Sequence, residues 1–266
     1  MTDSFSLERG DSPLLISIPH DGRELAPGME SRMTPEGLAL PDTDWHVRRL
    51  YEFARLFGAT VLAAKFSRYV VDLNRASTDE VLYDGQLSTG LCPAKTFSGS
   101  PVYIDAKGCD AAEQQQRTRE YWQPYHGAIA AELARIQRQF GYALLWDAHS
   151  IRGEVPTLFD GMLPDLNIGT NGGKSCDASL QRAVREIARA SSYSDVLNGR
   201  FQGGFITRHY GNPDANVHAI QLELAQRCYM NENTGAFDEH AAARLGETLK
   251  AMTSAFIAGA QRLSMG

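Results

Sequence analysis

The sequence predicts an α/β fold in which helices cover a largely parallel sheet. The run Ala-Leu-Leu-Trp at 143–146 is apolar throughout, as expected for a strand that is buried on both faces. It follows a long helical pattern and Gly141, a residue that suits a helix C-cap. Leu14–Ile18 is a second run of this form. Both runs end in polar residues, and open α/β sheets place their ligands at the carboxyl ends of such strands.

Size and composition narrow the classes of protein. At 266 residues and 43% hydrophobic content, with no internal repeat or linker, residues 1–266 are expected to form a single domain. A net charge of −6 argues against nucleic acid as a partner. No stretch approaches the roughly 20 apolar residues that cross a bilayer, and no signal peptide is visible. Four scattered cysteines without a Cys-x-x-Cys pair exclude a thiolate zinc knuckle and fit a cytoplasmic location.

The first expected strand, Leu14–Ile18, delivers His20 into a turn. An incidental histidine in a surface turn is the plain alternative to a site residue. A loop at Gly37–Asp44 then leads into a helix that ends at Gly58. Asp42 and Asp44 of this loop either cap the helix, or one of them, preferably Asp44, provides an oxygen ligand to a metal.

Two more strands are expected at Thr60–Ala64 and Arg68–Leu73, and the second leads into Asn74 and Arg75. The guanidinium of Arg75 is a rigid, permanently charged group that suits a carboxylate, and Asn74 adds a neutral donor. The alternative is that Asp72 and Arg75 pair with their neighbours. Residues 76–108 lack periodicity, which is typical of a functional loop or lid.

A helical pattern over Asp110–Phe140 is split by Pro124, and His126 in it is expected to be structural. The central strand follows and ends in Asp147, His149 and Ser150. These side chains can bind a metal or move a proton. We expect His149 to be a metal ligand.

The second half of the chain is expected to contain a strand at Leu166–Gly169 and a helix at Ala178–Ala190. The segment Gly199–Gly211 contains four side chains that can bind an anion or move a proton: Arg200, Arg208, His209 and Tyr210. Any one of them could be an ordinary surface residue, but four within eleven residues are harder to explain in that way.

Apolar and polar residues alternate along Val217–Ala225, and a helix at Asp238–Leu263 closes the chain. Such alternation fits a half-exposed edge strand with Glu223 in water. Alternatively, Gln221 and Glu223 both point into the site, with Glu223 as a general base.

The polar strand ends together indicate a metal site. Two histidines and one carboxylate form a catalytic zinc environment that leaves a fourth position for water. A further carboxylate takes the proton of that water, and Glu223 fits this role. Arginines near the strand ends indicate an anionic substrate. The residues alone therefore predict metal-assisted hydrolysis of a small anionic molecule.

Six motifs, collinear from Leu14 to Tyr229, resemble the N-formylglutamate amidohydrolase family, also called N-formylglutamate deformylases. They are Pro19-His20-Asp21-Gly22, Asp42-Thr43-Asp44-Trp45, Ser67-Arg68-Tyr69-Val70-Val71-Asp72-Leu73-Asn74-Arg75, Asp147-Ala148-His149-Ser150, Gly203-Gly204-Phe205-Ile206-Thr207-Arg208-His209-Tyr210-Gly211 and Gln221-Leu222-Glu223. One departure is Asp21, where the family form is Pro-His-Ser-Gly.

The resemblance implies a zinc-carboxypeptidase-like, three-layer α/β/α fold with a mixed, largely parallel sheet. It also implies hydrolysis of N-formyl-L-glutamate to L-glutamate and formate, in histidine degradation. In the wider zinc-hydrolase group an Asn-Arg pair binds the substrate carboxylate, which Asn74-Arg75 matches, and a late-strand Glu is the general base, which Glu223 matches. The group's His-x-x-Glu ligand pair is not reproduced, because Arg23 stands three residues after His20.

We therefore expect Zn²⁺ to be held by His20, Asp44 and His149, with Asp147 orienting a ligand histidine. Two rival interpretations remain: an amidohydrolase for another N-acylated acidic amino acid, and a metal-free binding protein for acidic amino acids. The remaining expected roles are oxyanion stabilisation by Arg208 or His209, and contacts to the second substrate carboxylate or to the rest of the substrate by Arg152, Arg200, Arg208 and Tyr210.

Overall fold

The computed structural model describes residues 3–78 and 89–265. At its centre is a seven-stranded mixed sheet with the strand order β1-β3-β2-β4-β7-β5-β6. The strands are β1 (Phe5–Glu8), β2 (Leu14–Ile18), β3 (Thr60–Ala64), β4 (Ala143–Ile151), β5 (Leu166–Gly169), β6 (Asp195–Leu197) and β7 (Val217–Ala225).

The four middle strands β3, β2, β4 and β7 run parallel to one another. β1 pairs antiparallel with β3 at one edge. On the other side, β5 pairs antiparallel with β7, and β6 runs parallel to β5. The predicted mixed, largely parallel sheet is confirmed, and β7 lies inside it. The alternative that Glu223 belongs to a half-exposed edge strand is wrong, because every residue of β7 is buried.

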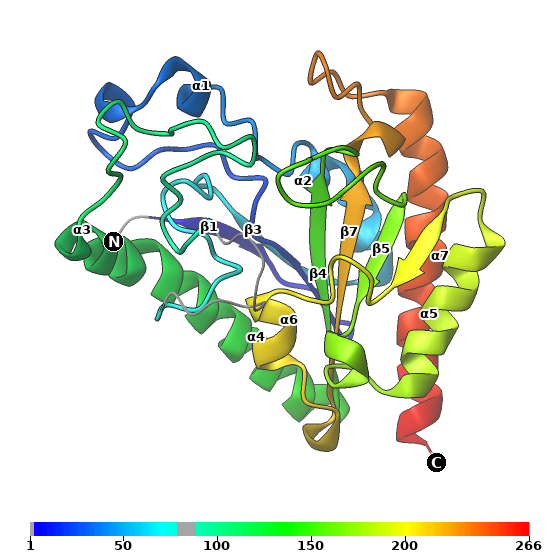
Figure 1. Ribbon diagram of the computed structural model, residues 1–266. Coiled ribbons are helices and arrows are strands. Elements are labelled where there is room, and N and C mark those ends of the chain that lie inside the picture. Colours follow the sequence, from blue (N-terminus) through cyan, green and yellow to red (C-terminus); the bar gives the residue numbers. More distant parts are fainter. Residues whose placement is uncertain (1–2, 79–88, 266) are drawn as a thin grey trace.

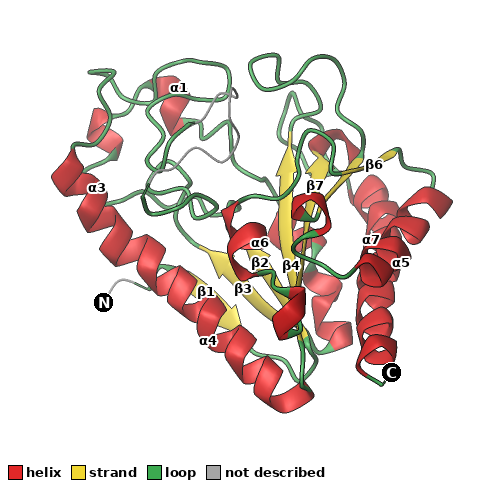
Figure 2. Cartoon of the chain, turned by 60° about the horizontal axis from the view of Figure 1, so that its bottom comes forward, coloured by secondary structure: helices red, strands yellow, loops and turns green. Residues whose placement is uncertain are grey.

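Helices cover both faces of the sheet, as Figures 1 and 2 show. α4 (Gln123–Phe140) packs on one face through Tyr125, Ile129, Leu133 and Ile136. On the opposite face, α2 (Val47–Leu50), α5 (Ala178–Ala190) and α7 (Glu239–Ser264) bury the apolar side chains of β2, β4 and β7. The three-layer α/β/α prediction is therefore confirmed. The other α-helices are α1 (Pro35–Leu38), α3 (Ala111–Arg117) and α6 (Phe205–Tyr210).

Several helix ends follow the signals in the sequence. Gly58 and Gly141 adopt φ of 59° and 81° as C-caps, in the left-handed region that favours glycine. Asp110 caps α3 by accepting the N–H of Glu113 at 2.8 Å. Short 3₁₀ segments lie at Glu30–Arg32, Glu52–Phe57, Asn171–Gly173, Pro213–Ala215 and Gln226–Cys228.

The predicted strand Arg68–Leu73 is wrong. This segment forms turns instead, because its backbone carbonyls bind side chains and not a neighbouring strand. The carbonyls of Tyr69 and Val70 each accept a hydrogen bond from Arg117 Nη1 at 3.1 Å. The capping role considered for Asp42 and Asp44 is also wrong, since α2 begins after His46 and the carboxylate of Asp21 accepts the N–H groups of His46 at 3.2 Å and Arg48 at 2.9 Å.

Ten residues of the expected lid at 76–108, numbers 79–88, lie outside the described residues. Within the part of the chain that is described, no helix is long and apolar enough to cross a membrane.

Candidate active site

The site lies where the sheet face that packs against α4 changes from apolar to polar side chains. On the face that packs against α4, β4 and β7 first present apolar residues that join the core, Leu145 and Ala219. Two and four residues further along β4, the same face presents Asp147 and His149. Their register partners on β7 are Gln221 and Glu223. The polar residues thus gather at the carboxyl ends of parallel strands, as the sequence predicted.

His20, Asp44 and His149 come together from three separate segments. One ligand atom of each lies within 4.8 Å of the others, and all three residues are buried. His149 Nδ1 is 3.1 Å from Asp44 Oδ2, and His20 Nδ1 is 3.8 Å from the same oxygen. Two imidazoles and one carboxylate are a donor set that zinc prefers. The residues therefore fit a divalent metal.

Each histidine of this cluster has a carboxylate behind it. His20 Nε2 donates to Asp72 Oδ1 at 2.8 Å, and His149 Nε2 lies 3.2 Å from Asp147 Oδ2. The first contact places the ring proton of His20 on Nε2, as in carboxylate–histidine–zinc sites. Both ring nitrogens of His149 face a carboxylate, Asp147 at Nε2 and Asp44 at Nδ1; burial opposes the charged ring, but these two carboxylates raise the pKa of His149 well above its ordinary value. Burial opposes ionisation of Asp72, but His20 and Arg68 hold its pKa well below the usual range.

Asp44 is prepared as an anionic donor. Its backbone N–H donates to the carbonyl of His20 at 3.0 Å, and its Oδ2 accepts the N–H of Ser150 at 3.0 Å. Burial works against the charged form, yet the hydrogen bond from His149 and the charges of His20 and Arg68 lower the pKa of Asp44. Its carboxylate is therefore ionised at neutral pH and available to a cation.

Arg68 is a site residue that the sequence reasoning missed. Its guanidinium donates to His20 Nδ1 and lies 3.4 Å from Asp44 Oδ1, so an ion bound by these two atoms would displace Arg68 from them to a position beside the cluster. The ring of Phe97 lies 5.0 Å from the guanidinium carbon. Arg68 is 9% exposed. The sequence does contain a signal for Arg68. This arginine stands directly before the apolar run Tyr69-Val70-Val71, inside one of the six motifs that resemble the family, and arginine is almost never fully buried unless it is paired.

Glu223 lies beside the cluster as the β7 register partner of His149. Its side chain is buried, and this burial raises the pKa of Glu223 to about 8, against the opposing charge of His149. A carboxyl group with a pKa near neutrality can take up and release a proton under working conditions.

Asn74 and Arg75 differ in their surroundings. Asn74 is buried, accepts the N–H of Ile206 at 2.8 Å through Oδ1, and places Nδ2 3.0 Å from His149 Nε2. Gly204 permits this packing, because a Cβ there would lie 2.3 Å from Asn74 Nδ2. Arg75 is partly exposed next to it. Asn74 therefore fixes its own loop, the segment that follows Leu73, to α6. Arg75 is the residue of the Asn74-Arg75 pair whose side chain reaches solvent.

The other predicted substrate contacts lie outside the histidine cluster. Arg200 Nε donates to the carbonyl of Leu158 at 2.6 Å, and Arg208 Nε donates to that of Gly203 at 2.7 Å. Arg152 Nη2 donates to the carbonyl of Glu232 at 2.7 Å.

The two aromatic candidates at the end of α6 are placed differently. The Tyr210 hydroxyl lies 3.0 Å from His126 Nδ1, so this side chain braces α4. His209 is exposed and stacks on Phe205, with ring centroids 4.8 Å apart.

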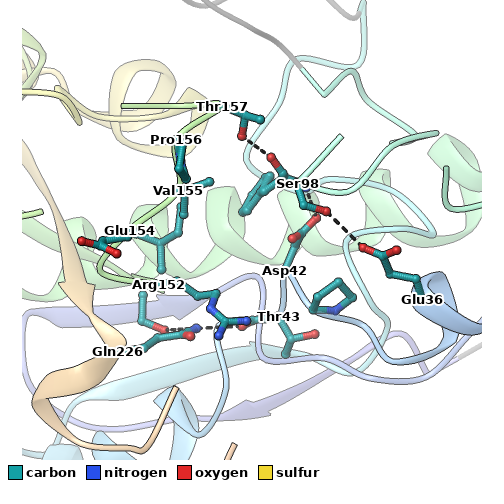
Figure 3. Close-up of a pocket in the computed structure, with 14 residues that line it drawn as sticks. Glu36, Asp42, Thr43, Ser98, Arg152, Glu154, Val155, Pro156, Thr157 and Gln226 are labelled. Carbon is teal, nitrogen blue, oxygen red and sulfur yellow. Dashed lines mark hydrogen bonds between the residues drawn. The ribbon is translucent and has the colours of Figure 1, made fainter. Parts of the chain in front are cut away.

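A pocket of about 450 Å³ borders the cluster through Asp42, Thr43 and Ser150, which adjoin the cluster segments in sequence. Figure 3 shows Arg152 reaching into it opposite Asp42. Asp42 accepts the Tyr69 hydroxyl at 2.7 Å and the N–H of Phe97 at 2.8 Å.

Comparison with known proteins extends these observations. A family model described as N-formylglutamate amidohydrolase matches residues 12–230. An N-formylglutamate deformylase of Pseudomonas aeruginosa is 55% identical over 233 residues, which is 87% of each chain. One from Pseudomonas putida is 48% identical and covers 98% of this chain and 99% of its own.

Solved structures agree in fold. The crystal structure of an N-formylglutamate amidohydrolase from Ralstonia eutropha JMP134 superposes with a TM-score of 0.81 at 24% identity, covering 96% of this chain and 98% of that one. A protein from Agrobacterium tumefaciens superposes with a TM-score of 0.71 at 20% identity, covering 95% of this chain and 96% of that one.

Proposed function

This chain belongs to the N-formylglutamate amidohydrolase family, and we propose that it hydrolyses N-formyl-L-glutamate to L-glutamate and formate, a step of histidine degradation. Relatives at 55% and 48% identity are named for this deformylation. The observation that carries the proposal is the position of Glu223 next to the His20–Asp44–His149 cluster. A proton acceptor beside a metal-type donor set is what amide hydrolysis requires.

A divalent ion, proposed to be Zn²⁺, would be held by His20 Nδ1, His149 Nδ1 and the Asp44 carboxylate. When bound, it acts as a Lewis acid that acidifies a water molecule and polarises the formyl carbonyl. Asp72 supports this assignment, because it accepts the Nε2 proton of His20 and leaves a lone pair on Nδ1. Asp147, 3.2 Å from His149 Nε2, would hold the ring proton of His149 there when Nδ1 binds the ion.

Glu223 is assigned as the general base. It accepts a proton from the attacking water and delivers that proton to the nitrogen of the leaving amine. Its raised pKa favours delivery of the proton, and the charge of a bound cation would lower that pKa and favour acceptance. Arg68 is assigned to stabilise the negative charge that develops on the formyl oxygen, because its guanidinium lies at the cluster and stays charged at every working pH. Arg208 and His209 are the alternative donors for that role; Arg208 Nε also donates to the carbonyl of Gly203, and His209 is exposed.

The substrate carries two carboxylates. Arg75 is assigned to one of them, as a charged fork held on a loop that packs against His149 through Asn74. Arg152, Arg200 and Arg208 are the candidates for the second carboxylate. Tyr210 is a further candidate for a substrate contact; its hydroxyl lies 3.0 Å from His126 Nδ1 and donates to the carbonyl of His126 at 3.0 Å.

Release of formate from N-formyl-L-glutamate by the purified protein tests the function. We expect turnover with this substrate and at least about 10²-fold less with the N-acetyl and N-succinyl analogues, because a site selective for formyl would leave room for only a hydrogen on the acyl carbon. Equal turnover of an analogue would indicate the related amidohydrolase activity. Tight binding of N-formylglutamate without hydrolysis would indicate a binding protein.

A further inference from the structure

Three consecutive backbone carbonyls of the Asn74-Arg75 loop accept hydrogen bonds from three separate groups. The carbonyl of Leu73 accepts from His126 Nε2 at 2.8 Å, and that of Asn74 accepts from the N–H of Phe205 at 3.2 Å. The carbonyl of Arg75 accepts from the indole Nε1 of Trp122 at 2.9 Å. Loops usually leave such groups to water, so the orientation of each peptide here is set by the protein.

Two of these donors stand on the helix that covers the sheet. Trp122 and His126 are one turn apart and stack, with ring centroids 3.8 Å apart and an interplanar angle of 24°. Because the rings support each other, both N–H groups are presented to the same loop. Phe205, which also contributes its backbone N–H, packs against both rings at 5.8 and 5.4 Å.

An irregular helical turn places Trp122. Residues Thr118–Trp122 form a π-helical turn, in which the N–H of Gln123 donates to the carbonyl of Thr118. Pro124 follows directly and has no N–H to donate to the carbonyl of Glu120. Widening the turn relieves the clash of the proline ring with that carbonyl. Such π turns are frequent at functional sites, and this one ends at Trp122, the first ring of the stacked pair.

His126 is fixed as a neutral donor. Burial lowers its pKa to about 4, so the ring carries one proton at neutral pH. Because Nε2 donates that proton to Leu73, Nδ1 is an acceptor, and the hydroxyl of Tyr210 lies 3.0 Å from it. Tyr210 thereby completes a chain of contacts from α6 to the loop.

We propose that Trp122 is a positioning residue for substrate recognition: its indole N–H fixes the carbonyl of Arg75 and so aims the Arg75 guanidinium at a substrate carboxylate. This inference rests on the proposed function, in which Arg75 binds that carboxylate. Trp122 acts through Arg75 and does not itself touch the reacting atoms. Its loss therefore weakens substrate binding and leaves the chemical step largely intact.

Trp122→Phe removes the N–H and keeps an aromatic ring for the stack on His126. We expect KM for N-formyl-L-glutamate to rise about 3- to 10-fold, the scale of one lost neutral hydrogen bond, while kcat changes less than about twofold. Replacing Trp122 with benzothienylalanine, in which sulfur stands for the indole N–H, is the second variant, because it keeps the full size of the ring.

Trp146→Phe is the matched control. The Trp146 indole also donates one hydrogen bond, to the Tyr51 hydroxyl at 2.8 Å, but it lies in the core on the opposite face of the sheet. We expect this variant to lose thermal stability without a rise in KM. A comparable rise in KM for Trp146→Phe would show that the Trp122 effect is general destabilisation, and would overturn the proposal.

A double-mutant cycle with Arg75→Ala separates the inference from the function on which it rests. If Trp122 acts through Arg75, Trp122→Phe raises KM in the wild-type background and adds nothing in the Arg75→Ala background. An equal rise in both backgrounds overturns the positioning role. If Arg75→Ala alone leaves KM unchanged, the assignment of Arg75 in the proposed function fails. If Arg75→Ala raises KM and neither Trp122 variant does, only the inference on Trp122 fails.

Discussion

His149 and Glu223 are register partners on the adjacent parallel strands β4 and β7. Because side chains at paired positions point to the same face, this register alone brings His149, a proposed metal ligand, next to Glu223, the proposed proton acceptor. Shifting either strand by one residue would turn one of the two side chains into the apolar layer beneath α5 and α7. The central sheet therefore sets the geometry of the site.

Glu223→Gln should abolish proton transfer while preserving the shape of the site. We expect kcat to fall about 10²- to 10⁴-fold, the usual scale for losing a general acid–base group. Metal content, measured by mass spectrometry, should stay at the wild-type level because Glu223 is not among the proposed ligands. Undiminished formate release by this variant would contradict the base assignment.

Arg68→Lys should lower kcat about 10²- to 10³-fold, the scale seen when one oxyanion donor is removed. A lysine keeps the charge but lacks the planar array of N–H groups. KM should change little, since the developing oxyanion exists only in the transition state. Steady-state kinetics separates the two parameters. A rise in KM at constant kcat would instead assign Arg68 to ground-state binding.

Arg75→Ala should weaken binding of N-formyl-L-glutamate by about 10- to 100-fold, because a charge-assisted pair is lost. N-formyl-L-glutamine and the α-amide of N-formylglutamate each lack one carboxylate. The analogue without the bound carboxylate should respond little to the substitution. Comparison of kcat/KM for the three substrates identifies that carboxylate, and equal losses for all three would argue against the contact.

His126 should make the free energy of unfolding depend on pH. Its folded-state pKa is about 4, below the ordinary value of 6.5, because the ring is buried. Between these values the unfolded chain binds a proton that the folded chain does not, so stability falls as the pH is lowered. The stability gained by keeping His126 neutral is fully present above pH 6.5. About 3 kcal/mol of the free energy of unfolding is lost as the pH falls from 6.5 to about 4.

Urea unfolding of the wild type and of His126→Gln at several pH values measures this effect. Glutamine retains an N–H donor for the carbonyl of Leu73 but does not titrate in this range. The variant should therefore lose less stability than the wild type between pH 7 and pH 4.5. Parallel pH profiles for the two proteins would rule out His126 as the source.

Much of the fold could be predicted from local patterns. The apolar runs at Leu14–Ile18 and Ala143–Trp146 and the helical stripe at Ala178–Ala190 reappear in β2, β4 and α5. The segment Arg68–Leu73 could not be predicted in this way. Its Val70 and Val71 favour a strand, but buried contacts from Arg117 override that preference, as tertiary contacts often do.

The candidate site shows the same division. His20 and His149 can be found from the sequence because each follows a buried apolar run, and the carboxyl end of a buried strand has a predictable place in a parallel sheet. The Asp72 contact with His20 and the Arg68 contact with Asp44 depend on turn geometry between distant segments. Contacts of this kind leave no repeating pattern in the sequence, so they cannot be predicted from it. Trp122 was missed for a related reason, since a π turn changes which face of the helix it occupies.

We propose that His20, Asp44 and His149 hold one divalent ion that the deformylation needs. Titration of metal-stripped protein with zinc measures this need when formate release from N-formyl-L-glutamate is the signal. We expect no activity before zinc is added, a linear rise, and a plateau at one equivalent per chain, with no rise for Asp44→Ala. Full formate release by the metal-stripped protein would show that the reaction needs no ion at this site.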